Sequence, residues 1–118
     1  MVILLKTIPE VINTMKHNIK TMSAAEAQKA CQREGGIFID VREPAEFNEK
    51  SAAGAINIPR GVLEMKTLQL YPDENIHIFI HCATGVRATF SAEQLQRIGY
   101  KNVVVITCKL DDIFASCE

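Results

Sequence analysis

The most informative segment of the sequence is IFIHCATGVRA, residues 78–88. It opens with three large apolar side chains, a pattern typical of a strand that is buried on both faces. The residues from Ala88 to Ile98 are good helix formers, with Phe90, Leu95 and Ile98 available for one face, and Gly99 is a natural helix end. Cys82 therefore lies in the turn between a predicted strand and a predicted helix. In open α/β proteins, this turn lies at the carboxyl edge of the sheet, where ligands bind.

Other apolar runs predict further strands of the same sheet. They are residues 37–41, 76–80 and 103–106, and each is a nearly continuous run rather than an alternating one. Runs of this kind favour a parallel sheet that is covered by helices on both faces. A helix is predicted from the capping box Ser23-Ala24-Ala25-Glu26 to about Arg33, before Gly35-Gly36.

The first predicted helix begins at Pro9 and carries an apolar stripe. Val11, Ile12, Met15 and Ile19 recur at helical spacing, so the helix is amphipathic. A stripe of four residues favours packing against the core over a membrane surface or a dimer contact.

Composition narrows the class of protein. The chain has 118 residues, 47% hydrophobic, which fits a single domain. Its formal net charge is −1, which argues against partners such as nucleic acid or an anionic membrane. The apolar run of residues 2–5 is too short for a secretory signal, and no stretch is long enough to span a membrane. We expect a cytoplasmic protein.

The four cysteines are Cys31, Cys82, Cys108 and Cys117. No two of them have the spacing of a zinc knuckle or a redox dithiol, so neither a metal site nor a cofactor is predicted. Cys31 and Cys117 are interpreted as inert side chains. Cys82 differs because a helix N-terminus, the turn amides and Arg87 would all favour an anion at its sulfur. Gly85 would let the backbone turn tightly enough for several amides to converge.

The segment around Cys82 resembles the rhodanese family of sulfurtransferases. Cys82 to Arg87 is similar to the family's active loop, Cys-x-x-Gly-x-Arg. Three further segments match family motifs: 40–47 (DVREPAEF), 54–59 (GAINIP) and 99–103 (GYKNV). The resemblance covers about residues 20–113. It implies a three-layer α/β fold with a mainly parallel sheet of about five strands flanked by helices. Residues 1–18 are then an N-terminal amphipathic helical extension, and residues 19–118 are the rhodanese-like domain.

The resemblance also implies a mechanism with Cys82 as the nucleophile. Its thiolate takes a sulfane sulfur from a donor such as thiosulfate, and an acceptor removes that sulfur from the persulfide. The backbone of the loop would bind the persulfide; its residues are Ala83, Thr84, Gly85, Val86, Arg87 and Ala88. Two roles are open for Arg87, which are fixing the loop and binding the donor's oxygens. The expected partners are a small sulfur donor and an acceptor or sulfur-carrier protein, and the chain is expected to be a monomer or homodimer.

Two other functions remain open at this stage. One is a noncatalytic rhodanese module that senses anions or docks proteins, against which the intact Cys82 argues. The other is a cysteine phosphatase or arsenate reductase. Cysteine phosphatases use Cys-x5-Arg, whereas here the arginine is the fifth residue after the cysteine, so the loop is one residue shorter.

Residues outside the loop have predicted supporting roles. By resemblance, Asp40 approaches the loop from a neighbouring strand, and Arg42 is expected to pair with Glu46 or Glu43. His81 is expected to pack or to hydrogen-bond, because adjacent strand residues point to opposite faces. Cys108 follows a strand that the family places beside that of Cys82, so it is a candidate resolving thiol.

Overall fold

The computed structural model describes residues 5–107, 111 and 113. In these residues the sheet has five strands in the order β1-β5-β4-β2-β3, and every pairing is parallel. The strands are β1 (Lys20–Met22), β2 (Ile37–Asp40), β3 (Ile56–Asn57), β4 (His77–His81) and β5 (Asn102–Ile106). The predicted α/β fold with a mainly parallel sheet of about five strands is confirmed.

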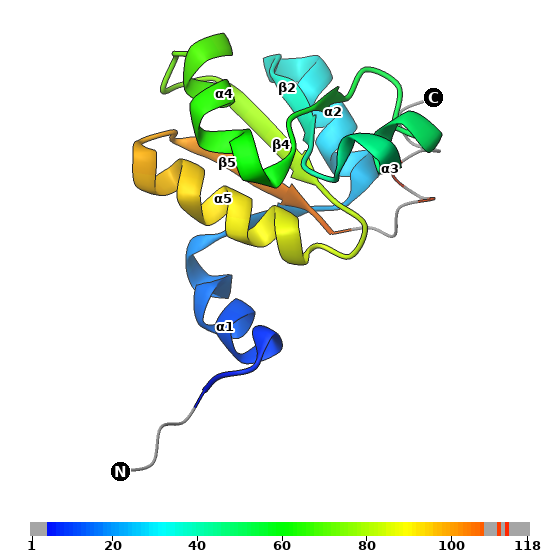
Figure 1. The fold of residues 1–118 in the computed structure, drawn as a ribbon. Helices are drawn as coiled ribbons and strands as arrows, with labels where there is room; N and C mark the ends of the chain where they lie inside the picture. Colours follow the sequence, from blue (N-terminus) through cyan, green and yellow to red (C-terminus); the bar gives the residue numbers. More distant parts are fainter. Residues whose placement is uncertain (1–4, 108–110, 112, 114–118) are drawn as a thin grey trace.

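Helices cover both faces of this sheet (Figure 1). They are α1 (Ile8–Met15), α2 (Ala24–Glu34), α3 (Pro44–Glu49), α4 (Leu63–Leu70) and α5 (Val86–Ile98), with short 3-10 turns η1 (Lys16–Asn18) and η2 (Arg60–Val62). The predicted capping box of α2 is confirmed, because Ser23 and Glu26 each bond the other's backbone amide. Within the described residues, no helix is long and apolar enough to cross a membrane.

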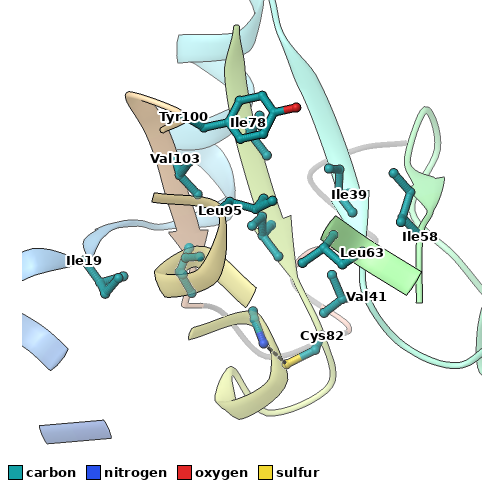
Figure 2. Packing of buried hydrophobic residues seen from close by; sticks show 14 of the residues in the cluster. Ile19, Ile39, Val41, Ile58, Leu63, Ile78, Cys82, Leu95, Tyr100 and Val103 are labelled. Atoms are coloured by element: carbon teal, nitrogen blue, oxygen red, sulfur yellow. Dashed lines mark hydrogen bonds between the residues drawn. The ribbon is translucent and has the colours of Figure 1, made fainter. Parts of the chain in front are cut away.

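The core has one apolar cluster on each face of the sheet. Residues of α1, α4 and α5 pack with Ile39, Ile80 and Val105 on one face (Figure 2). Alanines of α2 pack with Phe79 and Val104 on the other face. Successive residues of a strand point to opposite faces, so each buried strand serves both clusters.

The core-facing stripe of α5 differs from the predicted one. Ala88, Ala92 and Leu95 are fully buried, whereas Ile98 is 40% exposed. The three buried residues recur at helical spacing and already fill the contact with the sheet, which leaves the last turn at the rim.

The N-terminal helix is shorter than its apolar stripe. It ends at Met15, and Ile19 follows η1. Met15 and Ile19 are nevertheless buried in the cluster beside α5, and Val11 and Ile12 pack against it. This burial agrees with the predicted packing role. The boundary between residues 1–18 and 19–118 stays a prediction.

Candidate active site

Cys82 lies directly after β4, the central strand of the sheet. The turn that follows is only three residues long before α5 begins at Val86. Gly85 caps that helix with a φ of 90°, a left-handed conformation that favours glycine. The local sequence thus places a cysteine at the carboxyl edge of the sheet and at the amino end of a 13-residue helix.

Two backbone amides donate hydrogen bonds to the sulfur of Cys82. The Gly85 nitrogen is 3.0 Å from Sγ and the Ala88 nitrogen is 3.3 Å from it. The dashed line at the sulfur in Figure 2 marks a hydrogen bond to the Cys82 side chain. Amides that converge on one atom stabilise negative charge there, so this arrangement suits a thiolate nucleophile.

Arg87 forms a two-pronged ion pair with Glu46 of α3. Its Nη1 lies 2.7 Å from Oε1 of Glu46, and its Nη2 lies 3.1 Å from Oε2. Glu46 also accepts a bond from the backbone amide of Glu43. These interactions, with the hydrogen bonds of Arg87 first among them, lower the pKa of Glu46 to about 2. The same pair raises the pKa of Arg87. The pair ties the first turn of α5 to α3.

Arg42 takes a different main partner from the one expected. Its Nη2 is 2.8 Å from Oδ2 of Asp40, its Nε bonds both carboxylate oxygens, and its backbone amide bonds Oδ1. The main partner of Arg42 is thus Asp40 rather than the expected Glu46 or Glu43, although the charge of Arg42 also helps to lower the pKa of Glu46. Arg42 lies in the segment between β2 and α3, where the Asp40 carboxylate at the end of β2 is within reach of its guanidinium.

The Asp40–Arg42 pair is buried beside the loop. Both side chains are at most 5% exposed, and Arg42 Nη2 also bonds the carbonyl of Lys50 at the end of α3. Asp40 pairs with His81 in the sheet register, one residue before Cys82. Asp40 and Arg42 thus hold the turn after β2 against α3, next to the strand that precedes Cys82.

His81 is fully buried, and neither ring nitrogen has a hydrogen-bond partner in the described part of the chain. Its Nε2 is 3.8 Å from Oδ2 of Asp40, whose carboxylate Arg42 already occupies. Burial lowers the pKa of His81, and the nearby Asp40 carboxylate opposes this. The expectation that His81 packs in the core agrees with its full burial.

Of the other cysteines, the structure describes only Cys31. Cys31 is half-buried and free, and burial raises its pKa. Cys108 and Cys117 lie outside the described residues, so the resolving role of Cys108 stays a prediction. Among residues 5–107, 111 and 113, no group of three or more histidine, cysteine or acidic side chains could hold a metal ion.

Residues 23–113 match the family model described as Rhodanese-like domain. The chain is 31% identical over 85 residues to the "Putative sulfur carrier protein YrkF" of Bacillus subtilis (strain 168), which covers 72% of this chain and 45% of that protein. It is 32% identical over 66 residues to "Thiosulfate sulfurtransferase PspE" of Escherichia coli (strain K12), and this match covers 56% of this chain and 64% of that protein. The chain thus spans about half to two thirds of the length of these curated relatives.

One solved structure matches along almost the whole chain. It is a protein of unknown function from Rhodopseudomonas palustris CGA009, named a possible tyrosine phosphatase. The TM-score is 0.80, with 98% of this chain and 95% of that chain covered, at 21% identity. At that identity the likeness concerns the fold alone.

Proposed function

The chain belongs to the rhodanese-like domain family, and from that premise we propose that it is a sulfurtransferase that carries sulfane sulfur on Cys82. The observation that carries the proposal is the pair of backbone amides that converge on the Cys82 sulfur at the sheet edge. The names of the two curated relatives agree with sulfur chemistry.

The first step loads the enzyme. The Cys82 thiolate attacks the outer sulfur of thiosulfate or of a persulfide donor, and a new sulfur–sulfur bond forms. The old sulfur–sulfur bond breaks, and its electron pair leaves with sulfite or with the donor thiolate. Sulfur moves without any external oxidant or reductant.

The second step discharges the Cys82 persulfide. A thiophilic acceptor attacks the outer sulfur of the Cys82 persulfide, and the electron pair of the breaking bond returns to Cys82. The amides of Gly85 and Ala88 stabilise the thiolate that reappears. Amides from Ala83 to Ala88 stabilise the outer sulfur when it carries the charge. Neither step requires a metal or a cofactor.

Arg87 acts as a positioning residue in this mechanism. Its guanidinium is engaged by both carboxylate oxygens of Glu46, which favours fixing the loop over binding the donor's oxygens. Asp40 and Arg42 support the same region by holding the turn after β2.

The acceptor is either a small molecule or a sulfur-carrier protein, and the sulfur-carrier name of one relative favours considering the latter. We propose a cytoplasmic setting, in which reducing conditions keep Cys82 as a thiol.

The test is intact mass spectrometry after incubation with thiosulfate. We expect one added sulfur atom, removed by cyanide and absent from Cys82→Ala, while the matched Cys31→Ala protein still loads. If no sulfur adds from thiosulfate, mercaptopyruvate or polysulfide, the chain is not a sulfurtransferase. In that case Cys82-dependent hydrolysis of an aryl phosphate would indicate a phosphatase, and its absence would indicate a noncatalytic module.

A further inference from the structure

A cavity of about 450 Å³ lies between the N-terminal helix and the loop that follows Cys82. Ile12 of α1, Lys16 of η1 and Ile19 form one side of it, while Gly85, Val86 and Val105 form the other. Pockets that bind small molecules have volumes of roughly 300–1,000 Å³, so this one is large enough for a ligand.

The cavity adjoins the loop that follows Cys82, three residues of which line it: Thr84, Gly85 and Val86. Gly85 lines the cavity, and its backbone nitrogen lies 3.0 Å from Sγ of Cys82. A Cβ built on Gly85 would meet no atom within 4 Å, so the loop faces open space there. A molecule whose reactive end is at the loop can therefore extend its remaining part into this space.

The walls indicate what that remaining part is. Four lining residues are isoleucine or valine, four are threonines, and Lys16 is the only charged residue among the described ones. Aspartate, glutamate and aromatic side chains are absent from this described lining, which disfavours a polyamine or a stacked base. Apolar walls with a cation at one side suit a flexible aliphatic chain that ends in one acid group.

We infer that this cavity binds the tail of the sulfur acceptor, and that the acceptor is an aliphatic thiol with a terminal carboxylate. The inference rests on the proposed function. The acceptor thiolate attacks the outer sulfur of the Cys82 persulfide, a new persulfide forms on the acceptor, and Cys82 leaves as a thiolate. The chain lies along Ile12 and Val86, and the carboxylate meets Lys16. The N-terminal helix is then the element that selects the acceptor.

The experiment measures discharge of the preformed Cys82 persulfide by thiols of increasing length: 3-mercaptopropanoate, 6-mercaptohexanoate and 8-mercaptooctanoate. Each methylene that becomes buried is expected to raise the second-order rate by up to about fourfold. The acid 6-mercaptohexanoate should react up to about fivefold faster than the neutral 6-mercaptohexanol, because an exposed ion pair contributes at most about that factor.

Two lysine variants identify the cation. Lys16→Met should bring the acid-to-alcohol rate ratio to about one, whereas Lys66→Met, at an exposed position of α4, should keep the wild-type ratio. Ile12→Ala should flatten the dependence on chain length. The inference is overturned if the discharge rate does not depend on the length and charge of the thiol, or if Lys16→Met keeps the wild-type ratio. The proposed function stands in that case as long as Cys82 still accepts sulfur from the donor.

Binding of octanoate to the unloaded protein makes the test independent of turnover. Saturable NMR shifts at Ile12, Lys16 and Val86 that weaken in Lys16→Met would support the site even if no persulfide formed. Absence of these shifts in the wild-type protein overturns the inference.

Discussion

Glu46→Gln tests whether the ion pair to Arg87 holds the active loop in place. The substitution keeps the size of the side chain and removes its charge. In the wild-type protein the carboxylate bonds both terminal nitrogens of Arg87, at 2.7 and 3.1 Å. The variant retains at most one of these contacts, a hydrogen bond from the guanidinium to an uncharged amide oxygen, so α3 and the first turn of α5 lose their ion pair.

The expected cost follows from the pKa of Glu46, which the pair lowers from 4.5 to about 2. Fully converted at 1.36 kcal/mol per pKa unit, this shift would correspond to about 3 kcal/mol. The two side chains are 34% and 38% exposed, so solvent screens the pair. We therefore expect a loss of about 1 kcal/mol in the free energy of unfolding.

The assay is urea unfolding of wild type and Glu46→Gln as a function of pH. Because the folded pKa is lower than the unfolded one, the contribution is complete above about pH 4.5 and is lost as pH falls toward about 2. The discharge rate of the Cys82 persulfide should also fall, by up to about fivefold, because the loop is less well positioned.

Glu93→Gln is the matched control. Glu93 pairs with Arg97 at 2.6 Å through one oxygen on the outside of α5, where Arg97 is 72% exposed. This pair should contribute less than half as much and should leave the discharge rate unchanged. Equal effects of the two variants, or a stability difference that persists unchanged to pH 2, would refute the positioning role of Glu46.

Three further outcomes are expected. Asp40→Asn should cost about 3–5 kcal/mol in urea unfolding, because it leaves the buried guanidinium of Arg42 without its carboxylate; a loss below 1 kcal/mol would contradict this. His81→Gln should reduce the loss of stability between about pH 7 and pH 5, because burial lowers the pKa of His81 and the unfolded chain takes up that proton first; an unchanged slope would exclude His81 as its source. Gly36→Ala should strongly lower the thermal midpoint, because its φ is +130° and the new Cβ would collide with the His77 backbone, whereas Gly61→Ala, which meets open space, should unfold near the wild-type temperature.

The sheet was predictable because its strands carry a strong local signal. The runs at 37–41, 76–80 and 103–106 are short and almost wholly apolar, as strands buried on both faces must be. The turn at Cys82 was equally predictable, because a strand end, a glycine and a helix start lie within a few residues of one another.

The ion pairs were not predictable in the same way. Glu46 and Arg87 are 41 residues apart, and only the parallel sheet brings α3 and α5 close enough for them to meet. Arg42 precedes α3, which begins at Pro44, and its main partner is Asp40 at the end of β2. The cavity also escaped prediction, because segments far apart in the sequence form its walls.

The pairing of β1 has a consequence for how the protein is made. Its sole neighbour in the described sheet is β5, some eighty residues later in the chain, and α1 packs on α5. A ribosome that has released only the first hundred residues has therefore produced β1 without its partner, with Met15 and Ile19 lacking part of their cover. The cavity beside the loop after Cys82 is complete only when Thr107, which lines it, has been synthesised. Synthesis thus delivers Cys82 before the last two residues that line this cavity, Val105 and Thr107.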